Sequence, residues 1–443
     1  MITKTSFPGV YIEEDTSLAL SVSRGDTAIP VFIGRFSSEE NNSSLQVIRI
    51  NSWLDFTTKY PLPPVSISIT STPINPSIQL ELEEEQIRDS TETTNISITH
   101  KPSYDAIRLY FQNGGSPCYI LSLKDINDEK TLAKIPELIE QAADITLLVC
   151  SELDATYKNT VYTNLSPLLN NPKYHGKYFL IADTNTYDEG DPTIPTSLVE
   201  QDQAAIYYPL LKIQQPEDKN VKITGHQDTA ITNLAQLKVK DENTYKEVIK
   251  KIRDAKVGIV STSAVIAGVY CATDASRGIW KAPANVVLNG ISDVTKRLTD
   301  DEQGTLSQNG INAIRYFNNR GFVVWGARTL KDDDNWRYIP VRRLFNAAER
   351  DIRRAMQFAI FEPNSQPTWE RVRSAIENYL HQLWQQGALT GNKPQEAYFV
   401  QIGKDITMSD NDIKQGKMII KVGIAAVRPT EFIILQFSQN VAQ

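Results

Sequence analysis

The chain has 443 residues, 41% of them hydrophobic, which is enough for two or three domains with cores of their own. Its formal net charge is −7, and the excess acidity is confined to residues 1–100, which hold 13 acidic and 6 basic side chains. This balance disfavours general nucleic-acid binding, which requires a basic field, so no nucleic-acid partner is expected.

The first residues predict an extended arm followed by a buried strand. Residues 1–25 contain the β-forming run VYIEE, and a Pro-Gly pair excludes a helix there. TAIPVFIGRF at 27–36 is typical of a buried core strand. We therefore expect residues 1–36 to form an N-terminal arm and the first core strand. The apolar region of a signal peptide is missing, so we expect synthesis in the bacterial cytoplasm without such a peptide.

Residues 37–103 differ in composition from the rest of the chain. They are rich in Ser, Thr and Pro, and short runs alternate between polar and apolar residues. A period of two predicts half-exposed strands, so we predict an inserted β-rich module that faces outward. Its acidic stretch, ELEEEQIRDSTE at 81–92, is typical of a solvated or partner-facing surface. The alternative, that these residues pack as an ordinary part of a domain, stays open.

Residues 104–319 alternate between helical and strand patterns, which predicts a central α/β domain with a covered parallel sheet. Strands are predicted at CYILSL (118–123), ITLLVC (145–150) and KYFLIADT (177–184), and the loop-rich part that follows includes AAIYYPLLKI (204–213). Helices are predicted at 104–115, 128–142, 156–170 and 243–257.

The stretch VSTSAVIAGVYCATD at 260–274 resembles the nucleophile helix of subtilisin-like proteases. A serine nucleophile needs a base within hydrogen-bond reach and a third group that orients this base. The chain has four histidines, none in the sequence context that subtilisin-like enzymes use, and they are His100, His175, His226 and His381. We therefore interpret Ser261 and Ser263 as small residues of a helix packed tightly on a sheet, and expect Ser263→Ala to be tolerated.

Other catalytic and binding templates are absent from the sequence. There is no GxxxxGK[ST], no GxGxxG after a strand, no HExxH and no GxSxG. Cys118, Cys150 and Cys271 lie far apart without metal-ligand spacing, which favours free buried thiols in a reducing cytosol. We expect no catalytic residue, no cofactor and no bound metal. No apolar run reaches the roughly 20 residues of a membrane span, so no direct membrane insertion is expected either.

Residues 320–443 predict an α+β C-terminal domain. RGFVVWGARTL (320–330) is typical of a strand, and VRRLFNAAERDIRRAMQFAIF (341–361) is a helix with one apolar face. A second helix aligns apolar residues on one face and ends before Gly387; they are Trp369, Val372, Ile376, Leu380 and Leu383. Further strands are predicted at 396–402, 417–427 and 431–437, the last as a terminal strand arm.

Five stretches together resemble the contractile tail sheath proteins of phage tails, pyocins and extracellular contractile injection particles. They are PGVYIEE (8–14), AAIYYPLL (204–211), AVIAGVYCATDASRGIWKAPAN (264–285), RGFVVWGARTL with WRYIPVRRLF (320–345), and FEPNSQPTWERVRSAIENYLHQLWQQGAL with AYFV and VRPTEFIILQF. Residues 37–103 lie outside the resemblance. In this family the central domain is similar to a subtilisin fold without the catalytic triad.

The resemblance implies a structural role in a phage tail or a tail-like particle released from the cell. Many copies would stack in helical rings around an inner tube and contract to drive the tube through a target membrane. The implied partners are copies of the chain, sheath paralogues, the inner tube protein, and baseplate and cap components. Strand exchange between subunits would use the two terminal arms. The arm residues proposed for it are Val10, Tyr11, Ile12, Phe432, Ile434 and Phe437.

The resemblance also points to a helix of the C-terminal domain as the contact with the inner tube. The run RRLFNAAERDIRR at 342–354 places five arginines against only two acids. These arginines, proposed to face the tube, are Arg342, Arg343, Arg350, Arg353 and Arg354. The alternative is that they pair inside the protein, with Glu349, Asp351 or the acidic stretch at 81–92.

Three other functions remain open at this point. The chain could be a sheath paralogue restricted to a position near the baseplate. It could be a cytosolic α/β serine hydrolase that uses Ser263, in which case the purified monomer would show esterase or protease activity. Residues 37–103 alone could form an adhesion module, in which case that fragment would bind its target by itself.

Overall fold

The computed structural model describes residues 21–37, 45–62, 65–73, 92–174, 176–185 and 191–431. It divides the chain into two compact units. The central unit comprises residues 26–347 and 428–443, and the C-terminal unit comprises residues 348–427 together with 1–25. The chain therefore passes from one unit to the other three times.

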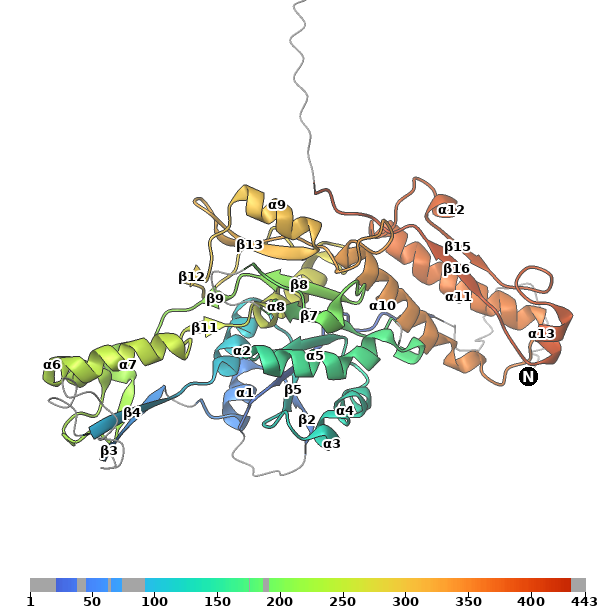
Figure 1. The fold of residues 1–443 in the computed structure, drawn as a ribbon. Helices are drawn as coiled ribbons and strands as arrows, with labels where there is room; N and C mark the ends of the chain where they lie inside the picture. The colour runs from blue at the N-terminus through green and yellow to red at the C-terminus, as the bar shows by residue number, and fades with distance from the viewer. Residues whose placement is uncertain are drawn as a thin grey trace, which may run out of the picture. The chain divides into compact units, whose positions relative to one another are not determined.

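The central unit is built on an eight-stranded sheet with the order β14-β13-β8-β7-β6-β1-β5-β2 (Figure 1). Its strands are β1 (Pro30–Gly34), β2 (Val47–Ile50), β5 (Cys118–Ser122), β6 (Leu147–Cys150), β7 (Phe179–Asp183), β8 (Ala204–Tyr208), β13 (Ile311–Phe317) and β14 (Gly321–Trp325). The six inner strands run parallel, and the two edge strands, β2 and β14, are antiparallel to their neighbours. The predicted α/β class, with apolar strands under covered faces, is confirmed.

Helices cover both faces of this sheet. Successive side chains of each strand point to opposite sides, so each strand contributes to two cores. Phe32 of β1 joins one core, with α1 (Trp53–Lys59), α2 (Pro102–Gln112) and α8 (Thr262–Arg277). Its neighbours Val31 and Ile33 join the other core. The helices on that side are α3 (Glu129–Leu132), α4 (Ile135–Gln141), α5 (Ala155–Asn170) and α9 (Asp300–Gln308).

The small residues of α8 allow a close helix contact, as the sequence predicted. A Cβ added at Gly268 would collide with the carbonyl oxygen of Tyr110 in α2, so only glycine permits this approach. Gly268 and Tyr110 are both buried, as is most of α8.

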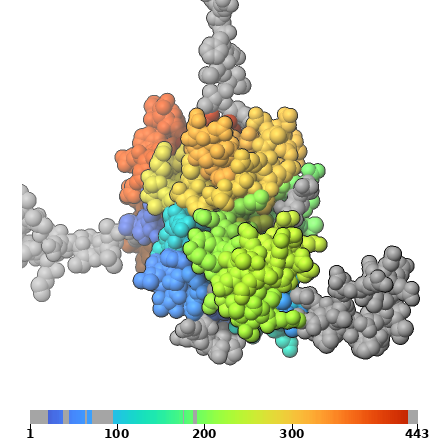
Figure 2. Space-filling model, turned by 90° about the vertical axis from the view of Figure 1, so that its left-hand side faces the viewer, coloured from blue at the N-terminus to red at the C-terminus, as the bar shows by residue number. Residues whose placement is uncertain are grey.

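A smaller sheet of β10 (Lys222–Thr224), β3 (Ser66–Pro73) and β4 (Glu92–Thr99) forms a separate part of the central unit with α6 (Leu234–Lys240) and α7 (Glu242–Asp254). Their side chains share one apolar core, and α6 and α7 expose a continuous surface, yellow-green in Figure 2. The predicted module at 37–103 is divided by this arrangement. Its first strand, β2, belongs to the large sheet, and its helix, α1, packs in the core of that sheet. Its later strands, β3 and β4, form a sheet with β10, which comes more than 100 residues later in the sequence.

A short three-stranded sheet contains β9 (Leu211–Lys212), β11 (Ile259–Val260) and β12 (Asp293–Val294). Among the described residues, 3₁₀ turns lie at η2 (Pro172–Tyr174), η3 (Thr196–Leu198), η4 (Asp218–Asn220) and η5 (Met356–Ala359). Within the described residues, no helix has the length and hydropathy required to cross a membrane.

The C-terminal unit contains the end of α10 (Ile339–Ala355) together with α11 (Gln366–Gln385), α12 (Pro394–Ala397), β15 (Tyr398–Gln401), α13 (Asp410–Lys414) and β16 (Lys421–Ile424). The predicted apolar face of α11 is confirmed, since all five of its residues are buried. The two compact units meet between residues 347 and 348, whereas the sequence led us to expect a domain boundary at residue 320. It would have divided the β13–β14 hairpin, whose two strands belong to one sheet.

Candidate functional site

The serine pair at the start of α8 forms a buried polar cluster with one carboxylate. Asp183, at the end of β7, accepts hydrogen bonds from Ser261 Oγ at 2.6 Å and from Ser263 Oγ at 2.8 Å. It also accepts the backbone N–H of Ser263 at 2.9 Å, and the two serine oxygens lie 2.8 Å apart. All three residues are fully buried. The carboxylate therefore caps the N-terminus of α8, where a negative charge and an acceptor are both stabilising.

None of the described histidines contacts this pair. His100 Nε2 lies 3.5 Å from Asp105, His226 pairs with Asp241 at 3.3 Å, and His381 contacts Tyr398 and Gln385. His175 lies outside the described residues. Among the described residues, the acceptors of these two buried hydroxyls are the carboxylate of Asp183 and the carbonyl of Cys150, and no histidine orients either serine. The arrangement supports the packing interpretation of the helix.

Two further members of this region were not anticipated from the sequence. Lys158 of α5 is fully buried and donates from Nζ to the carbonyl oxygen of Thr184 at 2.8 Å. Burial lowers the pKa of Lys158, and the nearby charge of Asp183 acts in the opposite direction. The only sequence signal for Asp183 was an acid at the end of an apolar strand, and Lys158 had none. Both serve the packing of helices on the carboxyl end of β7.

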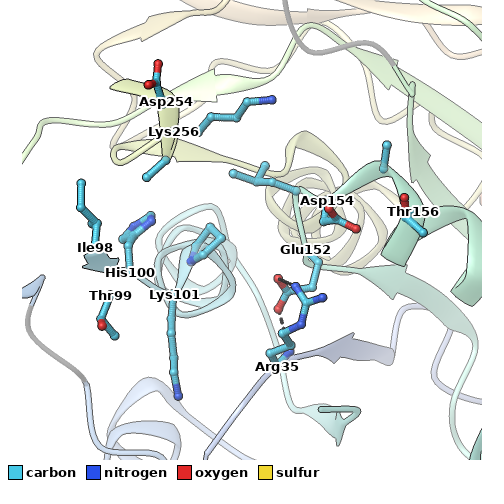
Figure 3. Close-up of a pocket in the computed structure, with 14 residues that line it drawn as sticks. Arg35, Ile98, Thr99, His100, Lys101, Glu152, Asp154, Thr156, Asp254 and Lys256 are labelled. Atoms are coloured by element: carbon cyan, nitrogen blue, oxygen red, sulfur yellow. Dashed lines mark hydrogen bonds and ion pairs between the residues drawn. The ribbon is translucent and has the colours of Figure 1, made fainter. Parts of the chain in front are cut away.

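A pocket of about 630 Å³ lies beyond the carboxyl ends of β1 and β6, between the large sheet and the smaller one (Figure 3). This edge of a parallel sheet is where α/β proteins commonly bind ligands. Its lining residues include Arg35, Ile98, Thr99, His100, Lys101, Glu152, Asp154, Thr156, Asp254 and Lys256.

Several charged groups of the pocket make contacts within the protein. Arg35 lies 3.4 Å from Glu152 and over the ring of Tyr157, and Glu152 also accepts from Ser103 Oγ at 2.6 Å. Lys101 donates to Ser37 Oγ at 2.6 Å. Cations and carboxylates are balanced here and contribute to internal contacts, so we assign no ligand to this pocket.

Two of the five arginines proposed for a surface contact are buried in the central unit. Arg342 stacks on the ring of Trp336 at 3.9 Å and donates to Asn346 at 2.8 Å. Arg343 forms a two-pronged ion pair with Asp274, at 2.7 and 3.0 Å. Burial alone would lower the pKa of Arg343, but Asp274 holds it above its ordinary value. The surface hypothesis is therefore wrong for Arg342 and Arg343, because the first half of α10 packs inside the central unit.

The other three arginines lie in the C-terminal unit, and two of them, Arg350 and Arg354, lie beside the buried Asp351. Its carboxylate lies 3.8 Å from Arg350 Nε and 3.4 Å from Arg354, and it accepts from Tyr379 at 3.1 Å and from the N–H of Gly25 at 3.2 Å. Arg353 and Arg354 remain exposed. Internal pairing, the alternative left open by the sequence, thus holds for Arg350 and Arg354 with Asp351, while an exposed basic surface remains.

The β15–β16 hairpin has two outer edges with no further strand among the described residues. Its register is Tyr398 opposite Ile424, and the side chains of Phe399 and Val422 are 53% and 37% exposed. Exposed edges of this kind can accept an added strand. The six proposed arm residues, Val10, Tyr11, Ile12, Phe432, Ile434 and Phe437, lie outside the described residues.

Comparison with known protein families matches two adjoining segments of the chain. Residues 213–330 match the phage tail sheath protein central domain, and residues 331–440 match the phage tail sheath C-terminal domain. A tail sheath protein of Vibrio phage KVP40 is 27% identical over 177 residues, 39% of this chain and 25% of the relative. A putative prophage major tail sheath protein of Pseudomonas aeruginosa is 25% identical over 173 residues, 38% and 43% of the two chains. The chain thus matches less than half the length of these curated relatives.

Solved structures extend the similarity over the whole chain. The helical sheath of the anti-feeding prophage in the contracted state is 45% identical, with a TM-score of 0.72, covering 98% of this chain and 100% of that one. The sheath complex of the PVC extracellular contractile injection system, also contracted, is 40% identical with a TM-score of 0.67, covering 99% of both chains. A sheath tail protein of Desulfitobacterium hafniense shares the fold at 11% identity, with a TM-score of 0.55.

Proposed function

The chain belongs to the phage tail sheath family, and from this membership we propose that it is a structural subunit of a contractile sheath. Copies would stack in helical rings around an inner tube and shorten the stack to drive the tube through a target membrane. The observation on which the proposal rests is the match of 45% identity to the contracted sheath of the anti-feeding prophage. The resemblance predicted from the five sequence stretches is confirmed by the same matches.

A direct test is negative-stain electron microscopy of the chain co-expressed with the products of its neighbouring genes. We expect tubular particles with a helical sheath, in long and shortened forms, and immunogold labelling of this chain along the sheath. Particles without a sheath, or a purified chain that stays monomeric in the presence of the neighbouring gene products, would contradict the proposal.

The edges of the β15–β16 hairpin support a mechanism for linking subunits. We infer that residues 1–20 of one subunit, or the segment from Phe432 of another, add a strand to an open edge, where main-chain hydrogen bonds supply affinity and exposed apolar side chains such as Phe399 supply specificity. Deleting residues 1–20 should then leave a folded subunit that does not assemble. Sheaths of normal appearance from this truncated chain would exclude the N-terminal arm as a link.

The exposed end of α10 is our proposed inner-tube contact, now limited to Arg353 and Arg354, since Arg350 is largely buried beside Asp351. Each exposed charge contact contributes at most about 1 kcal/mol, but many ring copies would add their contributions while separating on contraction. Reversing Arg353 and Arg354 to Glu should give empty or already contracted sheaths. Lys414 and Lys417 are exposed in the same unit, so their reversal to Glu is the matched control and should leave tube-filled sheaths intact.

A second candidate is a sheath protein restricted to the baseplate end of the particle. It is favoured by one observation, a chain from the anti-feeding prophage baseplate structure that is 44% identical over 99% of this chain. Immunogold labelling distinguishes the two, since a restricted protein would appear only at one end.

We further propose that the chain is not an enzyme and that its central sheet descends from a subtilisin-like fold whose nucleophile helix became a packing element. Support comes from Ser263, which is buried and bonded to Asp183 without a histidine among its described contacts. The serine hydrolase alternative would require Ser263 to react with a fluorophosphonate probe. We expect no labelling.

A further inference from the structure

The last described residue of the chain, Glu431, is held by a bidentate ion pair in the central unit. Its carboxylate accepts from Arg328 Nε at 3.0 Å and from Arg328 Nη2 at 2.7 Å, and from the hydroxyl of Tyr338 at 3.3 Å. The side chains of Arg328 and Glu431 are only 17% and 19% exposed. A two-pronged contact of this kind fixes both distance and orientation, and its partial burial limits screening by salt.

Arg328 is itself braced against the strands of the large sheet. Its N–H donates to Asn312 Oδ1 at 2.8 Å, and Asn312 Nδ2 donates to the carbonyl oxygens of Arg328 and of Ile206, at 2.8 and 3.1 Å. Asn312 lies in β13, Ile206 in β8, and Asn312 is 1% exposed. A Cβ at Gly326 would lie 2.7 Å from Asn312 Oδ1, so glycine is needed for this approach. Arg328 also donates to the carbonyl oxygen of Ser307 at 2.9 Å.

The preceding residues are bonded elsewhere, within the C-terminal unit. Ala425 donates to the carbonyl oxygen of Ala397, and Val427 donates to that of Ala388. Residues 428–430 then connect this part of the chain to Glu431. The described chain therefore ends at Glu431 in the central unit, beside Arg328, and not at the hairpin that precedes it in sequence.

We propose that Arg328, Tyr338 and Glu431 form a latch that anchors the root of the terminal segment to the eight-stranded sheet. The inference rests on the proposed function, in which this segment links a neighbouring subunit. Tension on the segment would then pass through Glu431 and Arg328 into Asn312 and on to β13 and β8. Without the latch, the same tension would act on β16, a four-residue strand that pairs with β15.

The latch is testable in the purified subunit by hydrogen exchange with mass spectrometry on a peptide covering residues 424–431, in which the N–H groups of Ala425 and Val427 are hydrogen-bonded. Arg328→Met keeps an unbranched stem but removes the charge-assisted hydrogen bonds, and should speed exchange in this peptide about tenfold. Tyr338→Phe should give a smaller acceleration, and it controls for misfolding because it removes only one hydroxyl. Lys331→Met, which removes a more exposed ion pair with Glu200 in the same region, should leave exchange unchanged.

A charge reversal sharpens the result. Arg328→Glu alone should accelerate exchange, and combining it with Glu431→Arg should restore part of the protection. Unchanged exchange in Arg328→Met, in a subunit with an unchanged melting temperature, would overturn the latch.

Assembled particles separate this inference from the function on which it rests. If the unaltered chain forms no sheath, the proposed function fails. If it forms sheaths, those of Arg328→Met should dissociate at lower guanidinium concentration than those of Lys331→Met. Equal resistance of the two variants would overturn the role of the latch in transmitting tension while leaving the sheath function intact.

Discussion

Asp183 accepts both the backbone N–H and the hydroxyl of Ser263, at 2.9 and 2.8 Å. The two residues lie on different elements, the end of β7 and the first turn of α8. The acid thereby replaces the local N-cap that α8 lacks, because the side chain of Ser261 makes no capping hydrogen bond within the helix. A group that resembles a catalytic serine is thus part of the fold's internal bonding.

This relationship predicts unequal effects for the two side chains. Asp183→Ala should lower the free energy of unfolding by about 3–5 kcal/mol, since it removes three hydrogen bonds to a buried carboxylate and the nearby negative charge that favours protonated Lys158. Ser263→Ala keeps the backbone contact and should cost about 1–2 kcal/mol. Urea denaturation of the purified subunit measures both. Equal losses in the two variants would show that the carboxylate is not the centre of the cluster.

The buried and exposed arginines of α10 should differ in the same assay. Arg343→Gln breaks the ion pair with Asp274 inside the core and should cost about 3–5 kcal/mol. Arg353→Gln removes an exposed charge and should change the stability by no more than about 0.5 kcal/mol. A small effect at both positions would mean that the Arg343–Asp274 pair contributes nothing net to the fold.

A capping box predicts part of the acid sensitivity. Glu302 accepts from the N–H of Thr299 at the start of α9 and pairs with Lys296 at 2.9 Å, and the Lys296 contact is the largest cause that lowers the pKa of Glu302 to about 2. Because the folded-state pKa lies below the unfolded value, this stabilisation is complete above the ordinary glutamate pKa and is lost as the pH falls toward 2.

Glu302→Gln should therefore lower the melting temperature at pH 7 but not at pH 2. Glu247→Gln removes an equal charge from the exposed surface of α7 without breaking a capping contact, and should show no such difference. If the melting temperature of Glu302→Gln stays below that of the unaltered chain at pH 2, the charge of Glu302 is not the cause.

Phe361 should be replaceable with a gain in stability. It follows η5, is fully exposed and adopts a φ of 71°, in the left-handed region that is costly for a side chain with a Cβ. Phe361→Gly should raise the free energy of unfolding by about 0.5–1 kcal/mol after the entropy of glycine in the unfolded chain is counted. Phe361→Ala keeps the Cβ and should give no gain. A loss in the glycine variant would indicate a packing role that its exposure does not suggest.

Much of the fold follows from local patterns. The apolar runs that became β1, β6 and β7 and the small-residue helix α8 were predicted, because continuous burial leaves a direct trace in composition. The alternation in β3 was also correct, with Ile67 and Ile69 buried and Ser68 and Thr70 exposed. Its sheet partner β10 was not predicted. Pairing between strands that lie far apart in the sequence depends on tertiary contacts, which the local alternation of residues does not reveal.

The polar interior was the part that sequence reasoning missed. Arg342 and Arg343 have the composition of a charged surface, and only the acids that meet them from other elements, such as Asp274, make their burial favourable. Asp183 and Ser263 are likewise 80 residues apart. The sequence predicted a basic surface on α10 but not which of its arginines are exposed. The residues of the turn that contains Arg342 and Arg343 do not by themselves show that this turn is buried.

The three passages of the chain between the two units have a consequence for exchange between relatives. Residues 348–427 are joined to the central unit at both of their ends. They form one compact unit with residues 21–25, which lie at the beginning of the described chain. A single crossover between two related genes would therefore join halves of units that had not been selected together. Functional chimaeras should require at least two junctions around residues 348–427 and matched residues before Asp26, so this unit is expected to be inherited as a discontinuous block.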